Sequence, residues 1–431
     1  MRRFRFSFHP GVLISLVAFA VGVLSFIPTK GAYALDEETA TVLKKPTPKD
    51  YRRQSRQFRG LWVSVVSNID FPSKPGLSPE ELMKETDEIL DRAAAMRFNA
   101  IFLQVRPMGD ALYPSELYPW SSFLTGEQGK APDPFFDPLR YWIDAAHARG
   151  MELHAWINPY RVTIGKKELG DLPPSNPAAQ HPEWTFKHGD RIYLNPGIPE
   201  AREHVVKGLV EIVKNYNVDG VHIDDYFYPE RNIEEDRQTF ETYGEGFDNI
   251  EDWRRNNVNL FIQDVNRAVH KVRSKVVWSV SPAGIWANKG SHPLGSDTRG
   301  NQCYFNLYAD VRKWIKEETI DAVIPQIYWH IGFDVADFST LVDWWSDVVS
   351  DVDVKLYVGI AAYRMDPNSK TEAWRDGGEL ERQLNYMAAS PDVDGQVFFT
   401  ANSFKEGKPA RDAILNYGDK HKWQAPKARI K

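Results

Sequence analysis

From residue 58 onward, short apolar runs rich in Val, Ile and aromatic residues alternate with longer helical stretches. The strand-like runs are 58–66, 99–107, 151–159, 218–226, 275–283, 321–329, 355–363 and 394–402. The helical stretches are 79–96, 138–149, 200–215, 250–272, 308–318, 337–350, 377–389 and 408–417. Such alternation is typical of parallel βα units. Eight complete units favour a closed (β/α)8 TIM barrel over an open doubly wound sheet, and the missing G-x-G-x-x-G motif disfavours dinucleotide binding.

The chain of 431 residues is long enough for one such barrel, which we predict over residues 58–420. The connections that follow several strands are long. They span residues 67–79, 108–137, 160–199, 227–249 and 284–307. Long loops in a compact domain are usually functional. We therefore expect these loops to form walls around a binding site that suits a polymer.

The N-terminus predicts a secretory signal peptide over residues 1–34. A basic start precedes an uncharged apolar run at 11–27, and Ala32-Tyr33-Ala34 supplies the small residues of a cleavage site. The alternative is a retained membrane anchor, although the run is shorter than the roughly 20 residues of a spanning helix. Residues 35–57 are charged and aperiodic, which predicts a flexible linker. We expect an exported protein of the periplasm, the cell envelope or the extracellular space.

Composition narrows the possible partners. Cys303 is the only cysteine, which excludes an intrachain disulfide and a zinc site built on cysteines. The net charge is −6, and residues 1–34 carry four basic and no acidic side chains, so the mature chain is near −10 (−6 minus 4). An acidic chain argues against nucleic acid as a partner. Aromatic residues make up 13% of the chain, and rings in polar loops can pack on sugar C–H faces.

The alternation of side chains within each strand predicts which of them face the barrel axis. The inward positions are Phe102, Gln104, Arg106, His154, Trp156, Asn158, His222, Asp224, Tyr226, Gln326 and Tyr328. Polar residues thus gather at the carboxyl ends of the strands. Active sites of this fold lie there, because the βα loops converge at that end.

The strongest chemical signal is the pair Asp224-Asp225, directly after an apolar strand. Two adjacent acids are costly at such a place unless they have a role, because one points into the barrel mouth. Repulsion and partial burial would raise one carboxyl pKa, so that this group could protonate a leaving oxygen near neutral pH. The alternatives are a helix N-cap, a structural ion pair with Arg106 or Arg161, and a divalent metal site.

Other polar and aromatic residues at the strand ends are candidates for substrate binding. They are Arg106, Asn158, Tyr160, Arg161, His222, Tyr226, Gln326, Tyr328, Trp329 and Tyr363. Arg and Asn side chains can hydrogen-bond sugar hydroxyls or an acetamido group, or hold a carboxylate in position. Each candidate also has a plainer interpretation as a loop cap or as core packing. His222 is expected either to orient Asp224 or to pack in the core.

Five motifs together resemble one known family. They are Phe58-Arg-Gly-Leu-Trp-Val, Phe102-Leu-Gln-Val-Arg-Pro, His154-Ala-Trp-Ile-Asn-Pro-Tyr, Asp219-Gly-Val-His-Ile-Asp-Asp-Tyr-Phe-Tyr-Pro and Pro325-Gln-Ile-Tyr-Trp. In this combination the chain resembles glycosyl-hydrolase-like family 10, which includes divisome-localised hydrolases of peptidoglycan, over about residues 56–417. The resemblance implies a TIM barrel that cleaves cell-wall glycan in peptide-free strands, with Asp224 and Asp225 as its site, no cofactor and a possible association with the envelope.

Two mechanisms fit such a site. In the first, the 2-acetamido group of the sugar attacks the anomeric carbon, with Asp224 orienting the acetamide and Asp225 protonating the leaving oxygen. In the second, a carboxylate on another element, such as Glu116, Asp297 or Asp334, completes an ordinary pair. The fifth strand ends in Ser-Pro-Ala without an acid, which favours the first mechanism.

Two rival functions remain open at this point. A catalytically inactive glycan-binding barrel would need the aromatic rings without the acids. A metal-dependent polysaccharide deacetylase would need an Asp with two His ligands. His222 lies near Asp224 in the sequence, whereas His154 is expected deep in the barrel. We therefore predict a glycoside hydrolase without a metal site.

Overall fold

The computed structural model describes residues 44–165 and 167–427. Eight parallel strands close into a barrel in the order β1-β10-β9-β8-β7-β6-β3-β2. They are β1 (Phe58–Val63), β2 (Ala100–Arg106), β3 (Glu152–Ile157), β6 (Gly220–Ile223), β7 (Val277–Val280), β8 (Ala322–Val323), β9 (Lys355–Ile360) and β10 (Val393–Phe398). Each lies within or beside one predicted run, so the predicted (β/α)8 barrel is confirmed. The predicted signal peptide lies outside the described residues.

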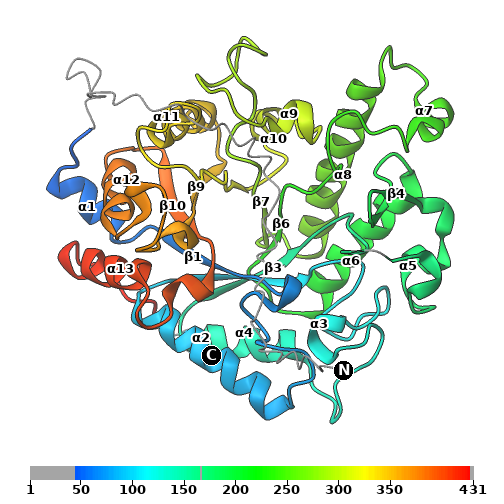
Figure 1. Cartoon of the computed structure of the whole chain (residues 1–431), viewed down its shortest axis with the longest axis horizontal. Helices are drawn as coiled ribbons and strands as arrows, with labels where there is room; N and C mark the ends of the chain where they lie inside the picture. Colours follow the sequence, from blue (N-terminus) through cyan, green and yellow to red (C-terminus); the bar gives the residue numbers. More distant parts are fainter. Residues whose placement is uncertain (1–43, 166, 428–431) are drawn as a thin grey trace, which may run out of the picture. The chain divides into compact units, whose positions relative to one another are not determined.

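Helices surround the strands (Figure 1). Those that complete the βα units are α2 (Pro79–Ala95), α4 (Pro138–Ala148), α6 (Pro199–Asn215), α8 (Ile250–Val272), α10 (Val311–Lys316), α11 (Phe338–Val349), α12 (Gly378–Ala388) and α13 (Pro409–Lys420). Shorter helices lie before the barrel or in the loops. They are α1 (Pro48–Gln54), α3 (Ser122–Thr125), α5 (Pro177–Gln180), α7 (Arg237–Tyr243) and α9 (Cys303–Asn306).

The helix starts follow from local sequence. Proline occupies the first turn of α1, α2, α4, α5, α6 and α13, where its missing N–H would have no helical partner. Ser78 caps α2 in a reciprocal box with Glu81, and the Asn249 side chain accepts from the third residue of α8. These signals fix where each helix begins and therefore how much chain is left for the loop before it.

Three local predictions need correction. Residues 48–54, predicted as part of a flexible linker, form helix α1, because Thr47 and Asp50 make a capping box and buried Gln54 donates to the Leu384 carbonyl. The loop after β3 contains an unpredicted antiparallel hairpin of β4 (Thr185–His188) and β5 (Arg191–Leu194). Strand β8 has only two residues, and the chain beyond it pairs through isolated bridges at Gln326.

The barrel wall separates two apolar clusters. The interior cluster consists of Trp62, Ala100, Phe102, Trp156, Ile324 and Val397. The outer cluster, between strands and helices, includes Ile101, Leu103 and Val105. The predicted faces of β2 are therefore confirmed as far as Gln104, which is buried and accepts hydrogen bonds from Val65 and Val66 backbone N–H groups after β1.

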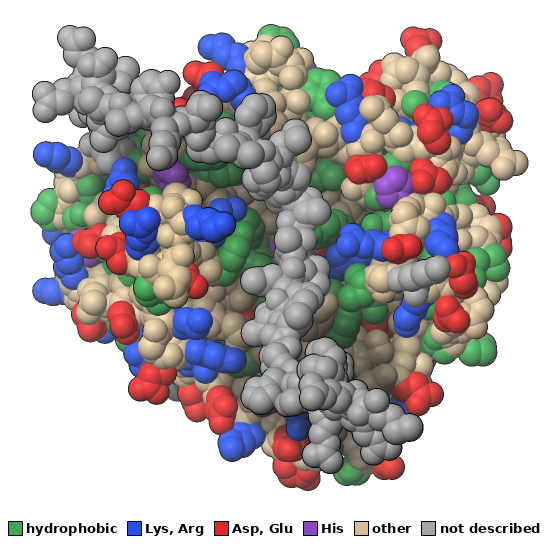
Figure 2. Space-filling view, in the orientation of Figure 1, with side chains coloured by type: hydrophobic (Ala, Val, Ile, Leu, Met, Phe, Trp, Pro, Cys, Tyr) green, Lys and Arg blue, Asp and Glu red, His purple; other side chains and the backbone are tan. Residues whose placement is uncertain are grey.

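Acidic and basic side chains intermingle on the face shown in Figure 2, without a continuous basic patch among the described residues there. Among the helices of residues 44–165 and 167–427, none has the length and apolar character of a membrane span.

Candidate active site

Asp224 is the first residue after β6, and two side chains from the neighbouring strand hold it. The Trp156 indole N–H donates to Oδ2 at 3.2 Å, and the Asn158 amide donates to Oδ1 at 3.2 Å. Because Trp156 pairs with His222 in the parallel register of β3 and β6, Asn158 lies beside Asp224 two residues further along. Asp224 is only 4% exposed. The carboxylate is thus fixed by neutral donors in a site almost closed to water.

Burial also raises the pKa of both carboxyl groups. Desolvation raises the pKa of Asp224 to about 6, against the opposing effects of the Arg161 charge and the hydrogen bonds from Trp156 and Asn158. Desolvation, together with the charge of Asp224, raises the pKa of Asp225 to about 7. Asp225 is more exposed than Asp224. Near neutral pH the pair therefore shares a proton, and the more accessible carboxyl holds it more tightly.

Arg161 is the cation beside the acid pair. Its guanidinium donates to the Pro107 carbonyl at 3.0 Å and lies 5.0 Å from the centroid of the Tyr226 ring. Its charge lowers the pKa of both acids, but it does so across space and not through a two-pronged ion pair with either of them. Arg161 thus moderates the repulsion between the acids and leaves their oxygens available.

Polar and aromatic residues from β8, β9 and β10 line the other side of the pair. The Gln326 amide hydrogen-bonds Asp225 and also donates to the Ser281 carbonyl at 2.9 Å. The Tyr328 ring lies 6.1 Å from Phe399 and 6.0 Å from Tyr363, which is 48% exposed. Trp329 is partly exposed and lies against Gly284. These rings form an aromatic surface next to the acids, and sequence reasoning missed Phe399.

His222 faces the barrel axis as predicted, but its partners are not the acids. Its Nε2 accepts from the Trp62 indole N–H at 3.3 Å, and its Nδ1 lies 2.9 Å from the Ser279 hydroxyl. Complete burial holds the pKa of this imidazole well below its usual value. His222 is therefore a neutral part of the packed barrel floor, and the predicted substrate contact is corrected because the ring has no exposed surface.

Arg106 points away from the barrel axis. The pairing of β2 with β3 shifts between Gln104 and Arg106, and this bulge reverses the face of the next side chain. The guanidinium lies 4.0 Å from the centroid of the Tyr118 ring. An added Cβ on Gly208 of α6 would lie 2.0 Å from Arg106 Nη1, so only glycine at position 208 leaves space for the guanidinium. The predicted inward orientation of Arg106 is therefore wrong.

Tyr160 is also absent from the barrel mouth. Its side chain is fully buried, and its ring lies 5.3 Å from Phe261 of α8. The predicted substrate contact of Tyr160 is corrected because the ring packs between the barrel wall and the helices. Asn158, Arg161, Tyr226, Gln326 and Tyr328 lie around Asp224 and Asp225, Tyr363 contacts Tyr328, and Trp329 lies against Gly284. Their predicted contacts with substrate stay predictions.

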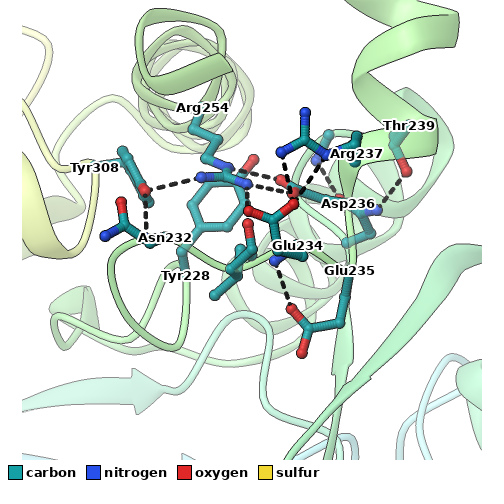
Figure 3. Close-up of polar contacts among 12 residues, drawn as sticks. Tyr228, Asn232, Glu234, Glu235, Asp236, Arg237, Thr239, Arg254 and Tyr308 are labelled. Carbon is teal, nitrogen blue, oxygen red and sulfur yellow. Dashed lines mark hydrogen bonds and ion pairs between the residues drawn. The ribbon is translucent and has the colours of Figure 1, made fainter.

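A buried ion pair anchors the loop that carries the acids (Figure 3). Arg254 of α8 donates to both oxygens of Asp236, at 2.9 and 2.5 Å, and both side chains are almost completely buried. The same guanidinium donates to the Tyr308 hydroxyl at 2.8 Å and to the Ile233 carbonyl at 2.6 Å. We call Arg254, Asp236 and Tyr308 the clamp. It ties the segment after β6 to α8 and to the loop after β7.

Asp70, which the sequence analysis did not select, ties together the loops after β1 and β10. Its carboxylate accepts from the Ser64 and Asn402 backbone N–H groups, both at 2.8 Å, and desolvation raises its pKa to about 6. No sequence signal distinguishes a buried acid in a loop, such as Asp70, from an exposed one. Its contacts indicate a structural role.

Two further observations bear on the chemistry. Glu116, Asp297 and Asp334, the predicted partners for a second carboxylate, are exposed. Within residues 44–165 and 167–427, no group of three or more His, Cys, Asp and Glu side chains is arranged to hold a metal ion. Cys303 is fully buried, and burial together with the charge of Asp225 raises the pKa of its thiol well above the usual value.

A family model described as Glycosyl hydrolase-like 10 matches residues 57–376. Glycosyl hydrolase YngK of Bacillus subtilis (strain 168) is 43% identical over 353 residues, which cover 81% of this chain and 69% of YngK. Glycosyl hydrolase DigH of Escherichia coli (strain K12) is 38% identical over 430 residues, which cover 95% of each chain.

A solved structure is similar in fold. The PgaB (BpsB) glycoside hydrolase domain from Bordetella bronchiseptica superposes with a TM-score of 0.53 at 14% identity. The match covers 83% of this chain and 98% of that domain. At this level of identity the likeness concerns the barrel alone.

Proposed function

Because the chain belongs to the glycosyl hydrolase-like 10 family, we propose that it hydrolyses O-glycosidic bonds in bacterial cell-wall glycan, in strands free of stem peptides. The observation that carries the proposal is the acid pair at the end of β6. Both carboxyl groups have raised pKa values, to about 6 and about 7, and neither forms a two-pronged ion pair with a cation. A carboxyl that stays protonated near pH 7 can donate a proton to a leaving oxygen.

The geometry favours different roles for the two acids. Asp224 is the more buried and is fixed by Trp156 and Asn158, so it suits a stationary carboxylate that orients the acetamido group of the sugar. Asp225 is more exposed and has the higher pKa, so it suits the proton donor. As the acetamido oxygen bonds to the anomeric carbon, the bond to the leaving oxygen breaks and that oxygen takes the Asp225 proton. Water then attacks the anomeric carbon and gives a proton to the Asp225 carboxylate, and the bond to the acetamido oxygen breaks.

Substrate assistance is supported by the state of the other acids. Glu116, Asp297 and Asp334 are exposed, and their side chains therefore lack the desolvated setting that Asp224 and Asp225 share. The aromatic surface of Tyr328, Tyr363 and Phe399 offers ring faces on which sugar C–H groups can pack. Arg161 supplies donors for hydroxyl or acetamido oxygens beside the acids, and the Gln326 amide oxygen offers an acceptor for a sugar hydroxyl, since its N–H groups bond Asp225 and the Ser281 carbonyl.

The test is digestion of intact and amidase-stripped peptidoglycan by the purified chain, with mass analysis of the released products. We expect faster cleavage of the stripped strands, and turnover lowered by a factor of about 10²–10⁴ in the matched Asp225→Asn variant. Binding without cleavage would instead identify a glycan-binding barrel. Release of acetate that EDTA abolishes would identify a deacetylase. Equal rates on both substrates would contradict the preference for peptide-free strands.

We also propose that the protein is exported, since Ala32-Tyr33-Ala34 follows an apolar run. Cleavage after this site would make Leu35 the first residue of the mature protein. N-terminal sequencing of the protein from its native host tests this, and an intact Met1 in the membrane fraction would indicate an anchor instead.

A further inference from the structure

A depression of about 350 Å³ lies away from the acid pair, where the loops after β2 and β3 meet α6. Its lining includes Glu116, Tyr118, Trp120, Ser175, Gln180 and His204. None of these residues belongs to the site around Asp224 and Asp225. The volume is at the lower end of the range for small-ligand sites, about 300–1,000 Å³.

Aromatic rings form one side of this depression. Trp120 is partly exposed, and its ring lies 6.3 Å from that of Phe135, which is 68% exposed on the adjoining loop. Among the exposed large hydrophobic side chains of the described residues, Phe135 has the largest exposed fraction. Tyr118 and His204 form the inner wall, with ring centroids 5.0 Å apart. Aromatic surface next to open polar groups is unusual for a loop that only connects two elements.

Two polar atoms of the inner wall have no hydrogen-bond partner among the described residues. They are the Tyr118 hydroxyl oxygen and the His204 Nε2, and both atoms are buried. Tyr118 is only 5% exposed. Desolvation and the nearby Arg106 charge lower the pKa of His204 to about 4, so its imidazole is neutral at pH 7. A neutral ligand group could satisfy these atoms, which otherwise cost free energy.

We propose that this depression binds a sugar unit of the same glycan, as a second saccharide site remote from the reacting bond. We call it the Trp120 site. Trp120 would pack on the sugar ring, and Gln180, Ser175 and the inner wall would bond its hydroxyl and acetamido groups, while Phe135 stands next to Trp120 outside the lining. The choice of ligand rests on the proposed function, whereas the existence of the site rests on these residues alone.

The charge of the lining favours an uncharged sugar. Among the described residues, Glu116 is the one acidic side chain of the lining, no lysine or arginine lines the depression, and His204 is neutral at pH 7. A carboxylate or phosphate on the ligand would lie beside this glutamate, whereas the Arg106 guanidinium is buried against the Tyr118 ring and is not part of the lining. The Trp120 site should therefore bind N-acetylglucosamine units in preference to sugars that carry an acid group.

The test measures binding of an uncharged N-acetylglucosamine trimer by calorimetry, in the Asp225→Asn background so that the probe is not consumed. We expect two saccharide sites per chain. Trp120→Ala should weaken one of them by a factor of about ten or more, and Gln180→Ala by a factor of about two to ten, the effect of one hydrogen bond. Gln180 is exposed, so its truncation is compatible with folding.

The matched controls are Asn416→Ala and Tyr243→Ala. Asn416 is an exposed amide in a depression of the same volume, about 350 Å³, between α12 and α13, and Tyr243 is 45% exposed. Both controls should bind the trimer like the parent. Unchanged binding in the Trp120 and Gln180 variants, while the parent hydrolyses glycan, would overturn the Trp120 site alone. Binding that depends on Trp120 in a chain that hydrolyses no glycan would support the site and overturn the proposed function.

Discussion

Two buried acidic sites lie on the segment that follows β6, and they are built in opposite ways. Asp236 accepts a two-pronged ion pair from Arg254, and the same guanidinium donates further hydrogen bonds to the Tyr308 hydroxyl and the Ile233 carbonyl. Asp224 and Asp225 face an indole, two amides and each other, and Arg161 acts on them only across space. Burial is shared by the two sites, so burial alone does not identify the reactive acid.

The difference lies in whether the charge of the carboxylate is neutralised. A buried ion pair with all its donors satisfied holds a loop in place and has no tendency to exchange a proton. A buried pair of acids without such a partner has raised pKa values, here about 6 and about 7, so near neutral pH one carboxyl can still carry the proton that acid catalysis needs. The clamp therefore supports this segment, and the acid pair carries the chemistry in the proposed function.

The largest expected effect is on catalysis, and it tests whether the acid pair, unlike the clamp, donates a proton. Asp225→Asn should lower turnover of natural glycan by a factor of about 10²–10⁴, the usual contribution of a general acid. It should largely spare an aryl 2-acetamido glycoside with a good leaving group, because that group needs little protonation. Steady-state kinetics on both substrates tests this. Equal losses on both would assign Asp225 the orienting role instead.

The next effect is on stability and concerns the clamp. Arg254→Met leaves Asp236 buried without a cation and should lower the free energy of unfolding by about 3–5 kcal/mol. The control is Arg237→Met, which removes the exposed pair with Glu234 seen in Figure 3 and should cost less than about 1 kcal/mol. Urea denaturation measures both. Similar midpoints for the two variants would show that the clamp does not stabilise this segment.

The barrel itself could be predicted from sequence because eight apolar runs and the helices between them repeat one simple pattern. The side chains at its mouth were harder to place. Asn158 and Asp224 follow strict alternation, but the bulge before Arg106 depends on how β2 pairs with β3, and nothing local to Arg106 signals it. Helix α1 could not be predicted because its charged residues look like a linker in the sequence. Its contacts with α12, which stabilise it, are visible only in the structure.

A smaller effect concerns the pH dependence of the acid pair. The proposed mechanism needs one ionised and one protonated carboxyl, and the two groups have pKa values of about 6 and about 7. We expect a narrow bell-shaped profile of kcat/KM that rises through the lower value and falls above the higher one. The apparent values belong to the pair and not to either residue. A broad plateau from pH 5 to about 9 would contradict a shared proton.

The last effect is a gain in stability that is confined to high pH. Because the folded-state pKa of Asp225 is raised from 3.8 to about 7, the folded chain binds this proton more tightly than the unfolded chain does. Its contribution to stability is therefore present below pH 4 and is lost as pH rises through about 7. Asp225→Asn avoids that loss and should raise the melting temperature at pH 8 but not at pH 4. Equal shifts at both pH values would contradict this origin.

The buried cysteine has a practical consequence for experiments on this site. Thiol reagents react with the thiolate. Cys303, the first residue of α9 in the loop after β7, is closed to solvent, and burial and the charge of Asp225 raise the pKa of its thiol. Its rate of modification should therefore report how often this part of the barrel opens. The modification rate of Cys303 thus measures local opening near the acids. Because Cys303 does not react in the folded chain, a single cysteine introduced on the surface could be labelled selectively.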